Sequence, residues 1–192
     1  MPIKELLIEL KAAYTGAALD CGDGLYPPAS EDAIHQLEVK LGVPVHEELK
    51  AVLRIHGGQE GIGAGTTGLF GSHKLLSPLE ILEWYEMTLQ VYRWHRSDPP
   101  DEFPPPGGRG GWWNPRLIPF ASWDAYGLCI HADRGDVWNF EPYGGLISHL
   151  PSIAAVLRYL IDEVKAGREP KLPYGSFGLD GDGRTDPSTS SG

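Results

Sequence analysis

The chain has 192 residues, of which 41% are hydrophobic, enough for the core of one domain without a metal or a disulfide. Its formal net charge of -10 disfavours nucleic acid and anionic membranes as partners. The charge is compatible with a basic protein partner, or simply with solubility. No apolar run approaches the roughly 20 residues that span a bilayer, and Met1–Ala13 contains Glu5 and Glu9. We therefore expect a cytoplasmic protein without a signal peptide.

Five stretches have apolar residues at helical spacing. The clearest begins at Ser77-Pro78-Leu79-Glu80, which combines an N-cap, a proline at the first helical position and a capping-box glutamate. Ser30, followed by two acidic residues, is a second N-cap. The first helix should end before Gly16 and lie against a sheet. The expected helices cover about residues 3–15, 31–41, 46–56, 78–93 and 153–166.

The region 112–151 is expected to form the sheet, because short apolar runs alternate there with turn sequences. Pro115 and Pro119 place the first run at a sheet edge or a strand end. Asp124-Ala125-Tyr126-Gly127 predicts a type I turn with Gly127 at positive φ, and Gly135 has the same role in the next turn. The runs cover residues 117–120, 128–132, 137–140 and 146–150.

Together these patterns predict an α+β fold in which about five helices surround a mixed, largely antiparallel sheet that ends in a meander. Residues 1–169 should form one domain. Residues 170–192 are rich in glycine, proline, serine and aspartate, so we expect a mostly disordered tail. Cys21 and Cys129 are far apart, and Cys129 stands in an apolar run, so we expect a buried thiol and no disulfide.

Aromatic and acidic residues beside loops are the best candidates for contact with a partner. Residues 97–111 are filled with proline and glycine and should form an exposed acidic loop. The tryptophans that border loops or turns can anchor a partner, although half-buried packing at the sheet rim is the alternative for each. The candidate contact residues are Asp98, Asp101, Glu102, Trp112, Trp113, Trp123, Asp124 and Glu141.

The glycine-rich segment does not predict a phosphate site. Gly63-x-Gly65-x-x-Gly68 has the spacing of a dinucleotide fingerprint. It follows a helix and runs into Leu69-Phe70, whereas a fingerprint lies between a strand and a helix. We interpret the segment as a plain loop.

The histidines do not form a recognisable metal or catalytic motif. His131-x-Asp133 offers two ligands on one side of a strand, yet no third ligand follows. Glu141 and Asp136, or Asp124, could pair as acid and base, but aspartates beside turns ordinarily hydrogen bond to the turn. We expect no metal, no cofactor and no catalysis. A small-ligand site or an enzyme that uses the hairpin 131–141 is the alternative.

Several motifs occur in the order that is typical of one family. They include Leu41-Gly42-Val43-Pro44-Val45, Leu53-Arg54-Ile55-His56-Gly57-Gly58-Gln59, Gly68-Leu69-Phe70-Gly71, Leu75-Leu76-Ser77-Pro78-Leu79-Glu80-Ile81, Asn114-Pro115-Arg116-Leu117-Ile118-Pro119-Phe120-Ala121, Leu128-Cys129-Ile130 and Val137-Trp138-Asn139-Phe140. Over residues 30–165 this order resembles the SUKH superfamily, in its Smi/Knr cell-wall-assembly-regulator branch. The chain departs from the family where Trp123-Asp124-Ala125-Tyr126-Gly127 replaces a glycine- and aspartate-rich turn, and where His131 replaces an acidic residue.

The resemblance implies an α+β fold with helices packed around a sheet and no established catalysis. Bacterial members resemble immunity proteins that bind and neutralise a cognate toxin, and fungal relatives resemble signalling scaffolds. The leading hypothesis is therefore a non-catalytic immunity protein that occludes a basic toxin domain, with a general regulatory scaffold as the alternative in the same class.

Overall fold

The computed structural model describes residues 1–19, 21, 24–62, 67–94, 113–124, 126–140 and 146–172. All five expected helices are present, and α3 ends at Leu53, earlier than expected. The elements in chain order are α1 (Ile3–Gly16), α2 (Glu31–Leu41), α3 (Glu47–Leu53), β1 (Lys74–Leu75), α4 (Pro78–Trp94), β2 (Leu117–Trp123), β3 (Tyr126–His131), β4 (Val137–Phe140), β5 (Leu146–Leu150) and α5 (Ile153–Lys165).

The strands form one five-stranded sheet in the order β1-β2-β3-β4-β5, which confirms the meander. Each strand pair in the described part of the chain is antiparallel, so the parallel component of the expected mixed sheet is not present there. The reason is the short connections from β2 to β5, because only antiparallel neighbours can be joined by tight turns. β2 lies between β1 and β3, so it is not an edge strand as its prolines suggested. Pro119 is tolerated there because β1 pairs only with Ala121 and Ser122, and no backbone N–H is required at Pro119 on that side.

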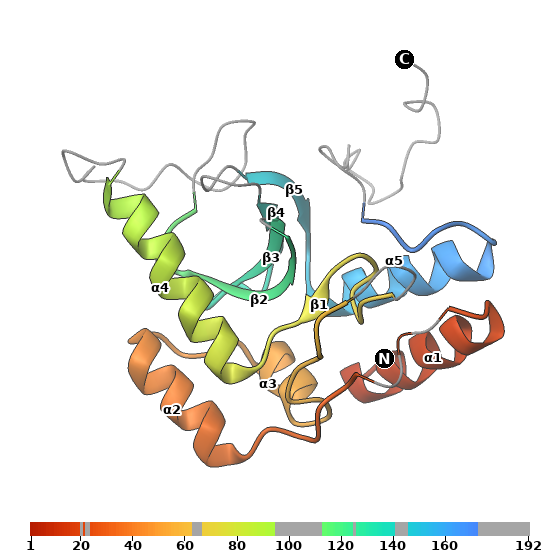
Figure 1. The fold of residues 1–192 in the computed structure, drawn as a ribbon, viewed down its shortest axis with the longest axis horizontal. Coiled ribbons are helices and arrows are strands. Elements are labelled where there is room, and N and C mark those ends of the chain that lie inside the picture. The colour runs from red at the N-terminus through yellow and green to blue at the C-terminus, as the bar shows by residue number, and fades with distance from the viewer. Residues whose placement is uncertain are drawn as a thin grey trace.

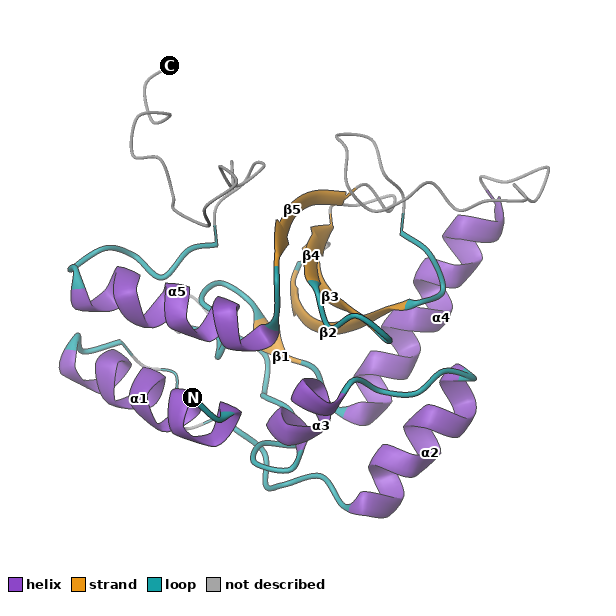
Figure 2. Ribbon diagram, turned by 180° about the vertical axis from the view of Figure 1, so that it is seen from behind, coloured by secondary structure: helices purple, strands orange, loops and turns teal. Residues whose placement is uncertain are grey.

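The sheet is strongly curved, with α4 on one side and α5 and α1 on the other (Figures 1 and 2). The rings of Trp84 on α4 and Phe140 on β4 meet edge to face at 6.1 Å, which places α4 against the sheet. We expected α1 against the sheet, but it packs on α5 and α3 instead. Leu6 and Leu10 of α1 are buried. Helix α5 follows β5 directly and contacts it, so α1 packs on α5 and not on the sheet.

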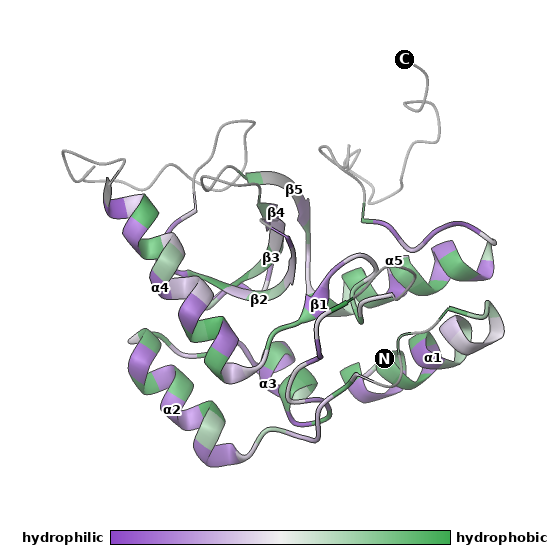
Figure 3. Cartoon of the chain, viewed as in Figure 1, coloured by the Kyte–Doolittle hydropathy of each residue, from purple (hydrophilic) through white to green (hydrophobic). Residues whose placement is uncertain are grey.

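Local sequence signals explain where α4 begins. The backbone N–H of Ser77 donates to Oε2 of Glu80 at 2.8 Å, and the backbone N–H of Glu80 donates to Oγ of Ser77 at 3.3 Å. These two bonds form the predicted capping box. The hydropathy colouring in Figure 3 alternates along α2 and α4, as expected for helices with one buried and one exposed face.

The folded part of the chain continues past residue 169. Pro170 and Leu172 are both buried, although we expected the tail to begin at Pro170. Pro170 packs directly beside Gly71, where an added Cβ would lie 2.0 Å from the carbonyl oxygen of Pro170. Residues 173–192 lie outside the described part. Cys21 and Cys129 are buried and form no disulfide, and none of the described helices is long and apolar enough to cross a membrane.

Candidate functional site

The β2–β3 hairpin closes more tightly than the sequence indicated. Trp123 and Tyr126 are cross-strand partners, so only two positions of the sequence separate the two strands. Positive φ occurs at Asp124 (φ 53) and not at Gly127, which corrects the expected type I turn. A two-residue hairpin favours positive φ at its first turn residue, and aspartate tolerates it better than most residues. Gly127 is required for another reason, because an added Cβ would lie 2.5 Å from Cε1 of Phe140.

The tip of this hairpin exposes a large aromatic surface. Trp123 is 44% exposed, and its ring stacks on Tyr126 with 5.8 Å between ring centroids and 25° between planes. Trp84 is partly buried, and Trp138 is buried. Trp123 is thus the exposed tryptophan among those whose side chains the structure describes, and it is one of the candidate contact residues.

Trp113, another candidate contact residue, is a core residue instead. Its side chain is 1% exposed and meets Tyr85 and Tyr92 of α4 edge to face, at 5.4 and 5.9 Å. Cys129 lies beside Trp113 and is itself fully buried, and this burial raises the pKa of its thiol well above the usual range. The Trp113 side chain acts in the opposite direction, lowering this pKa. Trp113 packs between α4 and the sheet, so it cannot contact a partner in this conformation. The adjacent residue in sequence, Trp112, lies outside the described residues, as do Asp98, Asp101, Glu102 and Glu141.

The polar residues of the β3–β4 turn are held by internal bonds. Asp136 is buried and accepts from Nε1 of Trp138 at 2.6 Å and from Nε of Arg134 at 2.9 Å. Burial alone would raise the pKa of Asp136, but the hydrogen bonds from Arg134 and Trp138 outweigh it and hold this pKa below its usual range. Asp136 therefore stays ionised and stabilises the turn.

His131 and Asp133 are engaged in the same way. The His131 ring is buried, with 2.9 Å between its Nε2 and Nη1 of Arg134. Burial, and then the charge of Arg134, lower the pKa of His131, so the ring is neutral at pH 7. Asp133 forms an ion pair with Arg116. No group of three or more histidine, cysteine or carboxylate side chains that could hold a metal occurs in the described ranges.

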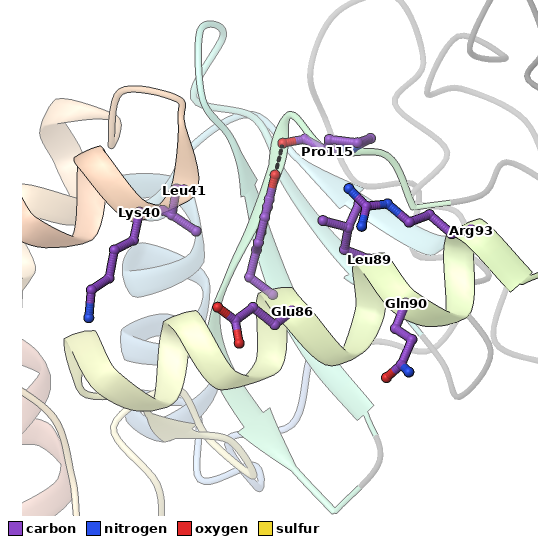
Figure 4. Close-up of a pocket in the computed structure, with 8 residues that line it drawn as sticks. Lys40, Leu41, Glu86, Leu89, Gln90, Arg93 and Pro115 are labelled. Carbon is purple, nitrogen blue, oxygen red and sulfur yellow. Dashed lines mark hydrogen bonds between the residues drawn. The ribbon is translucent and has the colours of Figure 1, made fainter.

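A separate groove of about 730 Å³ lies between α2 and α4. Leu41 and Leu89 are among its lining residues, and Tyr85 donates a hydrogen bond of 3.0 Å to the carbonyl oxygen of Pro115 at one side. Lys40 and Arg93 lie at opposite ends, with Glu86 between them (Figure 4). Charges of both signs line the groove, so its chemistry does not select one class of ligand. The lining residues are Lys40, Leu41, Tyr85, Glu86, Leu89, Gln90, Arg93 and Pro115.

The described structure is an α+β domain whose turn histidine and carboxylates are bonded internally and whose hairpin tip exposes an aromatic pair. Comparison with family models shows that residues 28–158 match the SMI1 / KNR4 family (SUKH-1). The match covers more than half of the chain, so the chain belongs to this family. A search of the curated proteins found no significant match.

Sequence reasoning missed two residues, Gln59 and His46, that hold loops of the domain in place. Gln59 is 3% exposed, and its Oε1 accepts from the backbone N–H of Leu69 at 2.8 Å. His46 lies over Gly135, where an added Cβ would be 2.5 Å from the imidazole ring. Both contacts join segments far apart in sequence, so no local pattern indicates them.

Proposed function

We propose that this protein is a non-catalytic protein-binding module and, more specifically, an immunity protein that neutralises a cognate toxin by direct binding. The observation that carries the proposal is the hairpin tip, where Trp123 is 44% exposed beside the exposed carboxylate of Asp124. Tryptophan is costly to leave in water and is a frequent hot spot of protein interfaces. Membership in the SMI1 / KNR4 family supports a binding role.

Charge complementarity favours a basic toxin domain as the partner. A net charge of -10 attracts a cationic protein over a distance of several ångströms and raises the association rate. The aromatic pair would then slow dissociation, because burying rings contributes most of the short-range free energy of binding. The proposed surface also includes the other candidate contact residues, Asp98, Asp101, Glu102, Trp112 and Glu141.

The proposed site of action is the cytoplasm, where a reducing environment keeps thiols free. Neither Cys21 nor Cys129 forms a disulfide, as expected there. A regulatory scaffold would use the same surface, so the two functions differ in what happens to the partner. An immunity protein abolishes the activity of the bound partner, whereas a scaffold leaves it active.

The experiment starts with affinity capture of the tagged chain from its own cells, followed by purification of the protein that binds it in stoichiometric amount. The partner alone and the reconstituted complex are then assayed for nuclease and other toxin activities. We expect the complex to be inactive at a one-to-one ratio. A partner that keeps its activity when bound would contradict the immunity function and favour the scaffold. Recovery of a metabolite or metal without a protein partner would contradict both.

A further inference from the structure

The stacked pair at the hairpin tip leaves a large part of an indole ring exposed. Trp123 and Tyr126 lie opposite each other at the end of the β2–β3 ladder, and their rings are 25° from parallel. Tyr126 stacks on the indole, and Trp123 nevertheless remains 44% exposed. The face of an indole ring carries negative electrostatic potential and attracts cations.

The residue after this tryptophan carries a carboxylate. Asp124 follows Trp123 directly and is exposed, and no ion pair to it occurs within the described part of the chain. The two aspartates of the β3–β4 turn are paired by contrast, Asp133 with Arg116 and Asp136 with Arg134. Among the described residues, no cation competes with a partner for the Asp124 carboxylate.

The described part of the chain places no ion-paired cation on Asp124. Residues 117–130 contain no lysine or arginine. On the neighbouring strand, Lys74 is the register partner of Ser122, and its Nζ is already held 2.5 Å from Oε1 of Glu80. An exposed aromatic ring and a carboxylate next to it in sequence, to which no described residue supplies a cation, are the two components of a cation-binding site.

We infer that the hairpin tip receives an arginine side chain of the partner, with the guanidinium stacked on the exposed indole of Trp123 and its N–H groups donating to Asp124. This inference rests on the proposed protein-binding function and names the chemistry of the contact. Arginine fits better than lysine because its planar, weakly hydrated guanidinium stacks on a ring while it donates sideways to a carboxylate. A lysine ammonium is more strongly hydrated and is not planar, so it cannot stack on the indole and donate to the carboxylate equally well.

The test uses model peptides, so it does not require the natural partner. The protein labelled with ¹⁵N is titrated with Ac-Gly-Ser-Arg-Ser-Gly-NH2, or with the same peptide carrying lysine, at constant ionic strength. The indole N–H signal of Trp123 is assigned by its loss in Trp123→Phe. We expect this signal to shift with the arginine peptide, with an affinity at least about threefold higher than for the lysine peptide.

Asp124→Asn removes the charge and keeps a residue that tolerates positive φ, so the hairpin should be preserved. It should weaken binding of the arginine peptide about threefold, since a surface ion pair contributes that much. The matched control is Asp162→Asn on α5, another exposed aspartate, which should change nothing. Equal shifts with both peptides, no shift of Trp123, or an unaffected Asp124→Asn variant would overturn the inference.

Failure of this test is distinguishable from failure of the proposed function. If the peptides do not discriminate but Trp123→Ala still weakens binding of the captured partner, the binding function stands and the arginine contact is wrong. If the arginine peptide binds as expected but the captured partner is indifferent to Trp123→Ala, the receptor exists and the assigned partner surface is wrong.

Discussion

The carboxylate of Glu48, on α3, caps α5 by accepting a hydrogen bond of 2.8 Å from the backbone N–H of Ile153. The same oxygen lies 3.3 Å from the backbone nitrogen of Ala154. These N–H groups have no acceptor within the helix, and the helix dipole places positive charge on them. Ser152 caps the next free N–H, that of Ala155, at 3.1 Å. Glu48 thus links α3 to the N-terminus of α5, a contact that the sequence pattern of neither helix indicates.

Removing this carboxylate should destabilise the fold. Glu48→Ala is expected to lower the free energy of unfolding by about 1–2 kcal/mol, as lost helix caps do. Glu48→Gln should recover part of the loss because its amide oxygen still accepts. Urea denaturation measures the difference, with Glu83→Ala on the exposed face of α4 as control. A loss no larger than that of the control would show that Glu48 does not stabilise α5.

Gln59 is expected to be sensitive to an apolar substitution of similar size. Its Oε1 lies 2.8 Å from the backbone N of Leu69 and 3.4 Å from that of Leu75, and both residues are fully buried. Gln59→Leu leaves the Leu69 N–H buried without its acceptor, which costs about 1–3 kcal/mol. Thermal unfolding should show the loss, and the Leu69 amide should exchange with deuterium faster. An unchanged exchange rate would contradict this account.

Gly127→Ala tests why β3 carries a glycine. The new methyl group would lie 2.5 Å from Cε1 of Phe140, so the ring must move, at a cost of about 1–3 kcal/mol. Gly16→Ala is the matched control, because nothing lies within 4 Å of its added Cβ and alanine favours the helix. We expect Gly127→Ala to lower the melting temperature and Gly16→Ala to leave it unchanged or raise it. The double variant Gly127→Ala with Phe140→Leu should recover stability if the ring clash is the cause.

Local patterns in the sequence account for the helix starts and the meander. The capping box at Ser77 and Glu80 and the glycine at positive φ in the β3–β4 turn, Gly135 (φ 76), both act within a few residues, and both were predicted. The packing of α1 on α5 was not predicted, because an amphipathic helix shows that it has a partner but not which one.

The candidate site was predictable only in part, for the same physical reason. Trp113 and Trp123 have similar loop-bordering sequence contexts, yet Trp113 is 1% exposed and Trp123 is 44% exposed. The difference comes from Tyr85 and Tyr92, which lie on α4 and enclose Trp113. Tertiary contacts of this kind have no signature in a single sequence.

Stability should fall as the pH drops below neutrality, and His73 should contribute most clearly. Burial lowers the pKa of His73 from 6.5 to about 4, against a smaller opposing effect of the Phe70 backbone. Below pH 6.5 the unfolded chain therefore binds a proton that the folded protein does not, so stability present above pH 6.5 is lost as the pH falls toward 4. The slope is at most about 1.4 kcal/mol per pH unit for one histidine.

Burial lowers the pKa of His56, His131 and His149 as well, which adds to the slope in the same range. His73→Leu should flatten the dependence of the unfolding free energy on pH by up to about one proton, whatever its effect at pH 7. Denaturation curves between pH 4 and 7 measure this. An unchanged slope would mean that His73 is protonated in the folded state.

The most direct test of the binding function is the affinity of the purified natural partner for the Trp123→Ala variant, measured by calorimetry. We expect a loss of about tenfold or more, as for a central interface tryptophan. Met87→Ala on α4 removes another apolar side chain, one that is 50% exposed, and should leave the affinity unchanged. Equal affinity of the Trp123→Ala variant and the unaltered protein would contradict the claim that the hairpin tip binds the partner.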